Sequence, residues 1–255
     1  MKTVTANGAH IPAVGFGTCG TSREDMLRTL PAALGAGFRH VDTAQIYRNE
    51  AAVGACVQAS GLDGADVFFI TKVWVANYAK ETFTASVDDS LRKLRTDYID
   101  LLLHWPSYPT VPLGEQIASL NAAMKAGKVR HIGVSNFTRQ LLAEAVRLSE
   151  APIVANQFEY HPYLDQRPLI EECRRLDVSV MAYCRMAVDR VFDDPVLLGI
   201  AGRRAKAVAQ VVVRGLIQQD GGSRCRARQI PRGLPRTSTC SDSHSALRNC
   251  RRSAT

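Results

Sequence analysis

The stretch Phe38-Arg-His-Val-Asp-Thr-Ala-Gln-Ile-Tyr47 decides the fold of this chain. A short apolar run around Val41 ends in Asp42, and Tyr47 follows five residues later. This pattern is typical of a buried strand that carries an acid at its carboxyl end, followed by a loop that presents a phenol.

Two later strand-like runs end in the same manner. Lys72 follows the run Val67–Thr71, and His104 follows the run Tyr98–Leu103. In a parallel barrel the carboxyl ends of all strands lie on one face. We therefore expect four residues that are distant in sequence to converge there, namely Asp42, Tyr47, Lys72 and His104.

Strand-like and helix-like segments alternate along most of the chain. The expected strands are 13–18, 38–42, 67–73, 98–104, 129–134, 153–158 and 178–183, and the expected helices are 22–35, 49–60, 80–94, 113–126, 138–148, 165–175 and 195–217. Continuous apolar strands indicate a parallel sheet that is buried on both faces. Seven such units predict an α/β fold of the (β/α)₈ TIM barrel type, preceded by a β-hairpin that turns at Asn7-Gly8. A doubly wound sheet is the alternative, but no Gly-x-Gly-x-x-Gly opens the first helix.

Composition places the chain in a broad class. Its 255 residues with 46% hydrophobic content can bury a large core, and no apolar run approaches the length of a membrane span. The first residues lack the apolar segment of a signal peptide. The seven cysteines include no Cys-x-x-Cys pair, which argues against a zinc site and against a disulfide framework. We expect a cytoplasmic protein without a metal.

The net charge of +8 comes from the carboxyl-terminal fifth of the chain. Residues 1–202 hold 20 Lys and Arg against 22 Asp and Glu, a balance of −2, whereas residues 203–255 hold 12 against 2, a balance of +10. A basic tail of this kind can bind nucleic acid or membranes. We expect neither partner here, because the tail departs from the rest of the chain in a way described below.

The four converging residues suit reduction of a carbonyl group. Asp42 can supply the counter-charge that a partly buried Lys72 needs, and a nearby ammonium lowers the pKa of a tyrosine. Tyr47 would then act as a general acid near neutral pH, while His104 orients the carbonyl oxygen. Each of these residues taken alone is more often structural. The set contains no nucleophile with an activating base, so acyl transfer is not expected.

Five motifs in unbroken order resemble the aldo-keto reductase superfamily, and in particular the bacterial 2,5-diketo-D-gluconate reductase-like members. They are Asp42-Thr-Ala-x-x-Tyr47, Thr71-Lys72-Val-Trp74, Leu102-Leu-His104-Trp105-Pro106, Gly133-Val-Ser135-Asn136-Phe137 and Asn156-Gln157-x-Glu-Tyr-His161-Pro162. The resemblance covers roughly residues 3–220. It implies a (β/α)₈ barrel that binds NADPH without a Rossmann motif and reduces a small aldehyde or ketone, with monomer as the usual state. It also implies that Asp42, Tyr47, Lys72 and His104 form the catalytic tetrad.

The same resemblance implies residues that contact the cofactor and the substrate. Ser135, Asn136 and Gln157 match the residues that hold the nicotinamide carboxamide, and Tyr183 matches the ring that stacks on the nicotinamide. Thr18 and Asp42 are expected at the cofactor as well. Trp74 and Trp105 would line the substrate pocket. For Tyr183 the alternative is an ordinary aromatic at the end of a strand, and for the two tryptophans it is plain core packing.

The carboxyl-terminal segment departs from the family. Cys184-Arg185-Met186 replaces the usual Ser-Pro-Leu, Gly215 stands where a tryptophan is usual, and residues 222–255 show neither helical nor strand periodicity. The lysine, serine, arginine and Glu-Asn pair with which the family holds NADPH are not seen. We therefore divide the chain into an incomplete barrel domain, 1–220, and an aberrant basic tail, 221–255, expected to be disordered. In this interpretation the last β/α unit is degraded or missing, which leaves unpaired strand edges.

Our hypothesis for the tail is an out-of-frame translation. When plausible codons for Arg232–Leu247 are read from the third base of the Arg232 codon, they give Arg-Leu-Ala-Glu-Asn-Leu-Asp-Val-Phe-Gly-Phe-Thr-Leu-Ser-Ala-Ala, which closely resembles the missing segment. Three functions follow as hypotheses. The first is an NADPH-dependent carbonyl reductase, the second an NADPH-binding regulatory or catalytically impaired barrel, and the third a nucleic-acid-binding protein that acts through its tail.

Overall fold

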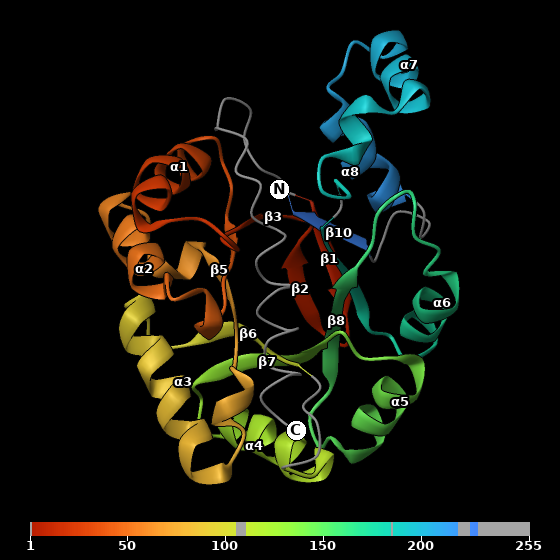
Figure 1. Ribbon diagram of the computed structural model, residues 1–255. Coiled ribbons are helices and arrows are strands. Elements are labelled where there is room, and N and C mark those ends of the chain that lie inside the picture. Colours follow the sequence, from red (N-terminus) through yellow and green to blue (C-terminus); the bar gives the residue numbers. More distant parts are fainter. Residues whose placement is uncertain (1, 106–110, 185, 219–224, 229–255) are drawn as a thin grey trace, which may run out of the picture.

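Eight parallel strands close into a barrel, as the alternating pattern predicts (Figure 1). The computed structural model describes residues 2–105, 111–184, 186–218 and 225–228. Around the barrel the order is β10-β3-β4-β5-β6-β7-β8-β9. The strands are β3 (Val14–Gly17), β4 (His40–Asp42), β5 (Phe68–Lys72), β6 (Ile99–His104), β7 (Val129–Ser135), β8 (Ile153–Glu159), β9 (Ser179–Tyr183) and β10 (Cys225–Arg228).

A β-hairpin precedes the barrel and covers the end where the strands begin. It consists of β1 (Thr3–Ala6) and β2 (Ala9–Pro12). Asn7 and Gly8 connect them with φ of 44° and 80°, the positive values that a two-residue hairpin turn requires. The Asn7 side chain donates to the carbonyl of Ile153 at the start of β8, and Ile11 packs into the barrel interior. The predicted hairpin is confirmed.

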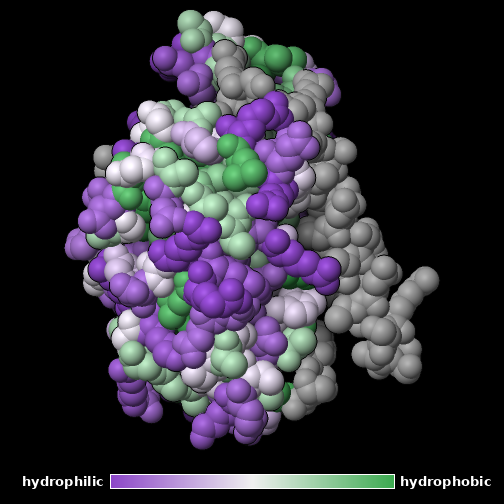
Figure 2. Space-filling view, turned by 90° about the vertical axis from the view of Figure 1, so that its left-hand side faces the viewer, coloured by the Kyte–Doolittle hydropathy of each residue, from purple (hydrophilic) through white to green (hydrophobic). Residues whose placement is uncertain are grey.

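Helices surround the outside of the barrel (Figure 1). They are α1 (Arg23–Gly35), α2 (Glu50–Ala59), α3 (Lys80–Leu94), α4 (Leu113–Lys125), α5 (Arg139–Leu148), α6 (Arg167–Arg175), α7 (Pro195–Arg203) and α8 (Val208–Gln218). The main hydrophobic core lies between these helices and the sheet, and a smaller core fills the barrel. On the face that carries α1 to α3, hydrophilic residues dominate and hydrophobic ones appear in small groups (Figure 2). Among the described helices, none combines the length and apolar character needed to span a membrane.

The segment expected to be one helix over 195–217 is divided in two. Ala205 has a φ of 48°, and the Lys206 amide donates back to the carbonyl of Ala201 over 3.0 Å. This is the bonding of a Schellman motif, in which a left-handed residue ends a helix. Glycine usually occupies that position, and an alanine there gives no signal in the sequence.

Of the two expected alternatives for the last β/α unit, degraded or missing, the structure shows a short strand in its place. The four-residue strand β10 pairs with β9, where Arg226 lies opposite Met181, and with β3, where Arg228 lies opposite Gly15. The two edges that we expected to be unpaired are therefore joined by this strand. Residues 219–224 and 229–255 lie outside the described residues, as does Arg185. The expected disorder of the tail stays a prediction.

Candidate active site

The register of the sheet decides which side chains face the barrel interior. Paired residues in neighbouring parallel strands point to the same side, and the side alternates with each residue. Lys72 pairs with Leu103, and Gln157 pairs with Met181. Both partners belong to the interior core. The same alternation places five predicted site residues on the interior face near the carboxyl ends of their strands: Asp42, Lys72, Ser135, Gln157 and Tyr183.

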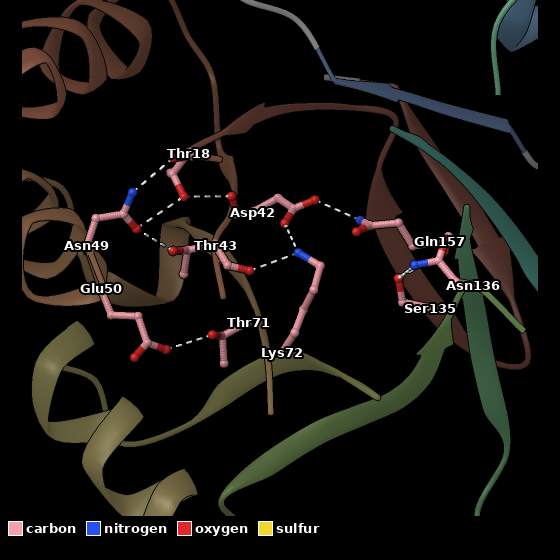
Figure 3. Close-up of polar contacts among 10 residues, drawn as sticks. All are labelled: Thr18, Asp42, Thr43, Asn49, Glu50, Thr71, Lys72, Ser135, Asn136 and Gln157. Carbon is pink, nitrogen blue, oxygen red and sulfur yellow. Dashed lines mark hydrogen bonds and ion pairs between the residues drawn. The ribbon is translucent and has the colours of Figure 1, made fainter. Parts of the chain in front are cut away.

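A buried ion pair lies at the centre of this group (Figure 3). The Lys72 Nζ donates to Asp42 Oδ1 over 2.5 Å and to the carbonyl of Thr43 over 2.9 Å. The second carboxylate oxygen, Oδ2, accepts from Gln157 Nε2 over 2.7 Å. A buried ion pair is tolerated when further hydrogen bonds satisfy its members, and both charges have such bonds here.

Tyr47 lies beside the ion pair. It ends the short 3₁₀ helix Gln45–Tyr47, which is separated from β4 by Thr43 and Ala44, and Arg48 closes this turn with a φ of 54°. The Lys72 Nζ lies 5.3 Å from the centroid of the half-buried Tyr47 ring. This is within the range of a cation–π contact. The structure thus brings three of the four predicted catalytic residues together.

The structure places His104 differently from the prediction. In β6 the interior position at the end of the strand belongs to Leu103, so His104, one residue later, faces the helices. Its ring stacks on Tyr78 at 4.0 Å between centroids, and its Nε2 is hydrogen-bonded to Gln116 Oε1 of α4. Its Nδ1 has no hydrogen-bond partner among the described residues. Burial lowers the pKa of His104 to about 4, so the ring is neutral at pH 7.

The reason for this difference is the two-residue period of a strand. The position of His104 at the end of an apolar run correctly predicts its height in the barrel. It does not fix the side of the sheet, because a shift of one residue moves a side chain to the opposite face.

The residues expected at the nicotinamide lie together at the ends of β7, β8 and β9. Ser135 Oγ donates to the carbonyl of Gln157 over 3.0 Å, and the Tyr183 hydroxyl donates to Asn136 Oδ1 over 2.8 Å. Asn136 adopts a φ of 61°, and its backbone N–H donates to the Gln157 backbone carbonyl over 2.7 Å. Hydroxyl and amide groups of this kind can serve a carboxamide, which offers both donors and an acceptor.

The three remaining predicted residues, Thr18, Trp74 and Trp105, form hydrogen bonds with residues outside the Lys72–Asp42 ion pair or with the backbone of Asp42. Thr18 is fully buried, and its hydroxyl lies 3.2 Å from the carbonyl of Asp42. The Trp74 amide donates to Gln45 Oε1 over 2.8 Å. The Trp105 amide donates to the Tyr78 hydroxyl over 2.8 Å. Both tryptophans are half-buried in the segments that follow β5 and β6, so their predicted contact with a substrate stays a prediction.

Sequence reasoning missed Asn49 and Thr43. Thr43 carries the carbonyl that accepts from Lys72, and its hydroxyl donates to Asn49 Oδ1 over 2.9 Å. An asparagine just before a helix suggests an N-cap, but the Asn49 side chain makes no capping bond to α2. The available signal was therefore misleading.

Comparison with known proteins identifies relatives of the chain. Residues 13–188 match the profile of the Aldo/keto reductase family. Methylglyoxal reductase DkgB of Salmonella typhimurium is 38% identical over 206 residues, which are 80% of this chain and 77% of that protein. An aldo-keto reductase of Mycolicibacterium smegmatis is 36% identical over 84% of this chain and 79% of that protein.

Comparison with solved structures leads to the same family. A crystal structure named as a candidate 2,5-diketo-D-gluconic acid reductase B superposes with a TM-score of 0.87 at 54% identity, covering 91% of this chain and 82% of that chain. An aldo-keto reductase of Bombyx mori in complex with NADP gives 0.81 at 31% identity, covering 89% and 83%.

Proposed function

Because the chain belongs to the aldo/keto reductase family, we propose that it reduces a small aldehyde or ketone to the alcohol with NADPH, and that Tyr47 acts as the general acid. The observation that carries this proposal is the buried Lys72–Asp42 pair beside the Tyr47 ring. The names of the relatives, methylglyoxal reductase and 2,5-diketo-D-gluconic acid reductase, suggest a carbonyl compound with a second oxygen function nearby.

The proposed chemistry divides the reduction between a hydride and a proton. NADPH, when bound, would supply the hydride that the carbonyl carbon accepts. The Tyr47 hydroxyl gives its proton to the carbonyl oxygen, and the nearby ammonium of Lys72 stabilises the negative charge left on the phenol oxygen. Asp42 fixes that ammonium through Oδ1, while Gln157 holds the other carboxylate oxygen.

The chain has groups that fit a nicotinamide. Ser135, Asn136 and Gln157 offer hydroxyl and amide groups at the carboxyl ends of β7 and β8. Gln157 uses its amide nitrogen for Asp42, so its side-chain oxygen can accept from a carboxamide. Tyr183 faces the same interior side and would stack on the nicotinamide ring. The Bombyx mori relative, solved with NADP, supports this choice of cofactor.

The test is the substitution Tyr47→Phe. We expect NADPH oxidation with methylglyoxal or 2,5-diketo-D-gluconate to fall by at least about a hundredfold, because general acid catalysis contributes 10²–10⁴-fold. Tyr98→Phe is the matched control. The Tyr98 ring lies against the Arg130 guanidinium, just before β6 begins. The Tyr98→Phe variant should therefore keep the activity of the unaltered protein. Unchanged turnover in Tyr47→Phe would remove the proposed mechanism.

A second candidate function is favoured by the position of His104. The His104 ring faces the helices, so the group expected to orient the carbonyl lies on the other side of β6, and the chain could bind NADPH with little turnover. Titration by cofactor fluorescence, combined with a broad panel of aldehydes and ketones, separates the two. Tight NADPH binding without turnover on any member of the panel would favour the impaired barrel.

A further inference from the structure

We propose that Asn49 is a positioning residue, which holds the Lys72 ammonium in place through Thr43 and thereby supports proton transfer. This inference rests on the proposed reductase function. Asn49 stands between the Tyr47 turn and α2 and is 5% exposed. It touches neither the ammonium nor the carboxylate of the ion pair in the contacts described (Figure 3).

The Asn49 amide is fully used in hydrogen bonds that cross the structure. Its Nδ2 donates to the carbonyls of Thr18 and Thr21, over 2.9 and 3.3 Å. Its Oδ1 accepts from the hydroxyl of Thr43 over 2.9 Å and lies 3.4 Å from that of Thr18. Two donors and two acceptor positions are all that a side-chain amide has. One side chain therefore ties together the segments that follow β3 and β4.

Thr43 connects the Asn49 side chain to the Lys72 ammonium, because its hydroxyl donates to Asn49 and its carbonyl accepts from Lys72. The Thr43 carbonyl accepts one Lys72 proton and Asp42 Oδ1 accepts another. Thr18 also holds the Asp42–Thr43 segment, because its backbone N–H and its hydroxyl both lie within hydrogen-bond distance of the Asp42 carbonyl. A shift of Thr43 would carry both oxygens away from the ammonium.

A displacement of this kind matters more for catalysis than for folding. Misplacement of a catalytic group by about 1 Å can cost about a hundredfold in rate. The hydrogen bonds of Asn49 are made to the segments that follow β3 and β4, beside the ion pair, so their loss should loosen that region specifically. The expected signature is a lower kcat with little change in KM or in NADPH affinity.

The experiment compares Asn49→Ala with Asn121→Ala. Asn121 of α4 is equally buried and accepts from the Ala151 amide over 2.9 Å and from Ser149 Oγ over 3.2 Å, remote from the ion pair. Both variants remove a hydrogen-bonded buried amide and should lower the melting temperature. We expect kcat to fall about tenfold to a hundredfold in Asn49→Ala, and to stay within about twofold of the unaltered protein in Asn121→Ala, measured well below both melting temperatures.

A double-mutant cycle tests the route through Thr43. Thr43→Val removes only the hydroxyl that donates to Asn49, and we expect kcat to fall here too. If both residues act through the same bond, the double variant Asn49→Ala/Thr43→Val loses no more than Asn49→Ala alone, whereas Asn121→Ala/Thr43→Val shows the product of its two single effects. Unchanged kcat in Asn49→Ala, or additive effects of Asn49→Ala and Thr43→Val, would overturn the inference.

Hydrogen exchange keeps this inference separate from the proposed function. Unaltered protein without any turnover, or an active Tyr47→Phe variant, would count against the reductase proposal. In that case the Asn49 inference is decided by exchange in peptides that contain Thr18–Thr21 and Asp42–Thr43. Faster exchange there in Asn49→Ala, but not in Asn121→Ala, supports the positioning role, and equal exchange in both contradicts it.

Discussion

The Lys72 side chain shows how the fold holds a buried charge beside an aromatic ring. It is 3% exposed, and the Asp42 side chain with which it pairs is 6% exposed. Burial of either charge alone is costly, so the ion pair and its hydrogen bonds to Thr43 and Gln157 must form together. The fold therefore holds a cation next to the Tyr47 ring in a position that water cannot easily screen.

The substitution Lys72→Met follows from this arrangement. It leaves the Asp42 carboxylate buried without its counter-charge, which costs about 3–5 kcal/mol of unfolding free energy, and it should also abolish reduction. Lys125→Met is the control, because the Lys125–Glu150 pair is 69% exposed on both sides and should contribute no more than about 1 kcal/mol. Urea unfolding of both variants gives the comparison. Equal losses would show that the Lys72 pair is not desolvated.

His104 makes a separate prediction about pH. Its folded pKa of about 4 lies below the usual 6.5, so between these values the unfolded chain binds the extra proton. Stability should therefore be complete above pH 6.5 and fall by about 3 kcal/mol as the pH drops to 4. In His104→Leu this part of the pH dependence should disappear, whereas His10→Asn, at an exposed position, should keep it. Parallel curves for the unaltered protein and His104→Leu would contradict the described burial.

At the scale of elements, the sequence predicts position along a strand better than the direction of a side chain. Asp42 and Lys72, at the ends of apolar runs, and Gln157, inside the run 153–158, lie on the interior face near the carboxyl ends of their strands. For β6 the uniformly apolar run Leu101–Leu103 is compatible with either register. Only the pairing of Leu103 with Lys72 and with Gly133 decides it.

The period of β6 gives an element-scale prediction. Insertion of one isoleucine between Leu103 and His104 should turn His104 to the interior and place the new side chain against Tyr78 and Phe137. If the chain has low activity because the His104 ring faces the helices, kcat should rise at least about tenfold. The control is the same insertion combined with His104→Ala, which should show no gain. An equal gain in both would mean that the insertion acts without the imidazole.

At the scale of the whole molecule, closure of the barrel depends on its least predictable strand. The strands up to β9 are predicted from continuous apolar runs. Cys225-Arg-Ala-Arg228 alternates apolar and basic residues over only four positions, which is too short a pattern to identify a strand in the sequence. It pairs in parallel with both β3 and β9 through backbone hydrogen bonds, which depend little on the side chains of the strand.

Truncation tests this closure. A chain that ends at Arg228 retains each strand pairing described, whereas a chain that ends at Gln218 loses β10 and exposes the facing edges of β3 and β9. Exposed edges pair with other molecules, so we expect the shorter chain to melt at a lower temperature and to scatter light increasingly with concentration. The chain that ends at Arg228 should show a smaller loss of melting temperature and less light scattering. Identical melting and scattering of the two chains would show that Cys225–Arg228 does not close the barrel in solution, and the expectation of an open barrel would then be restored.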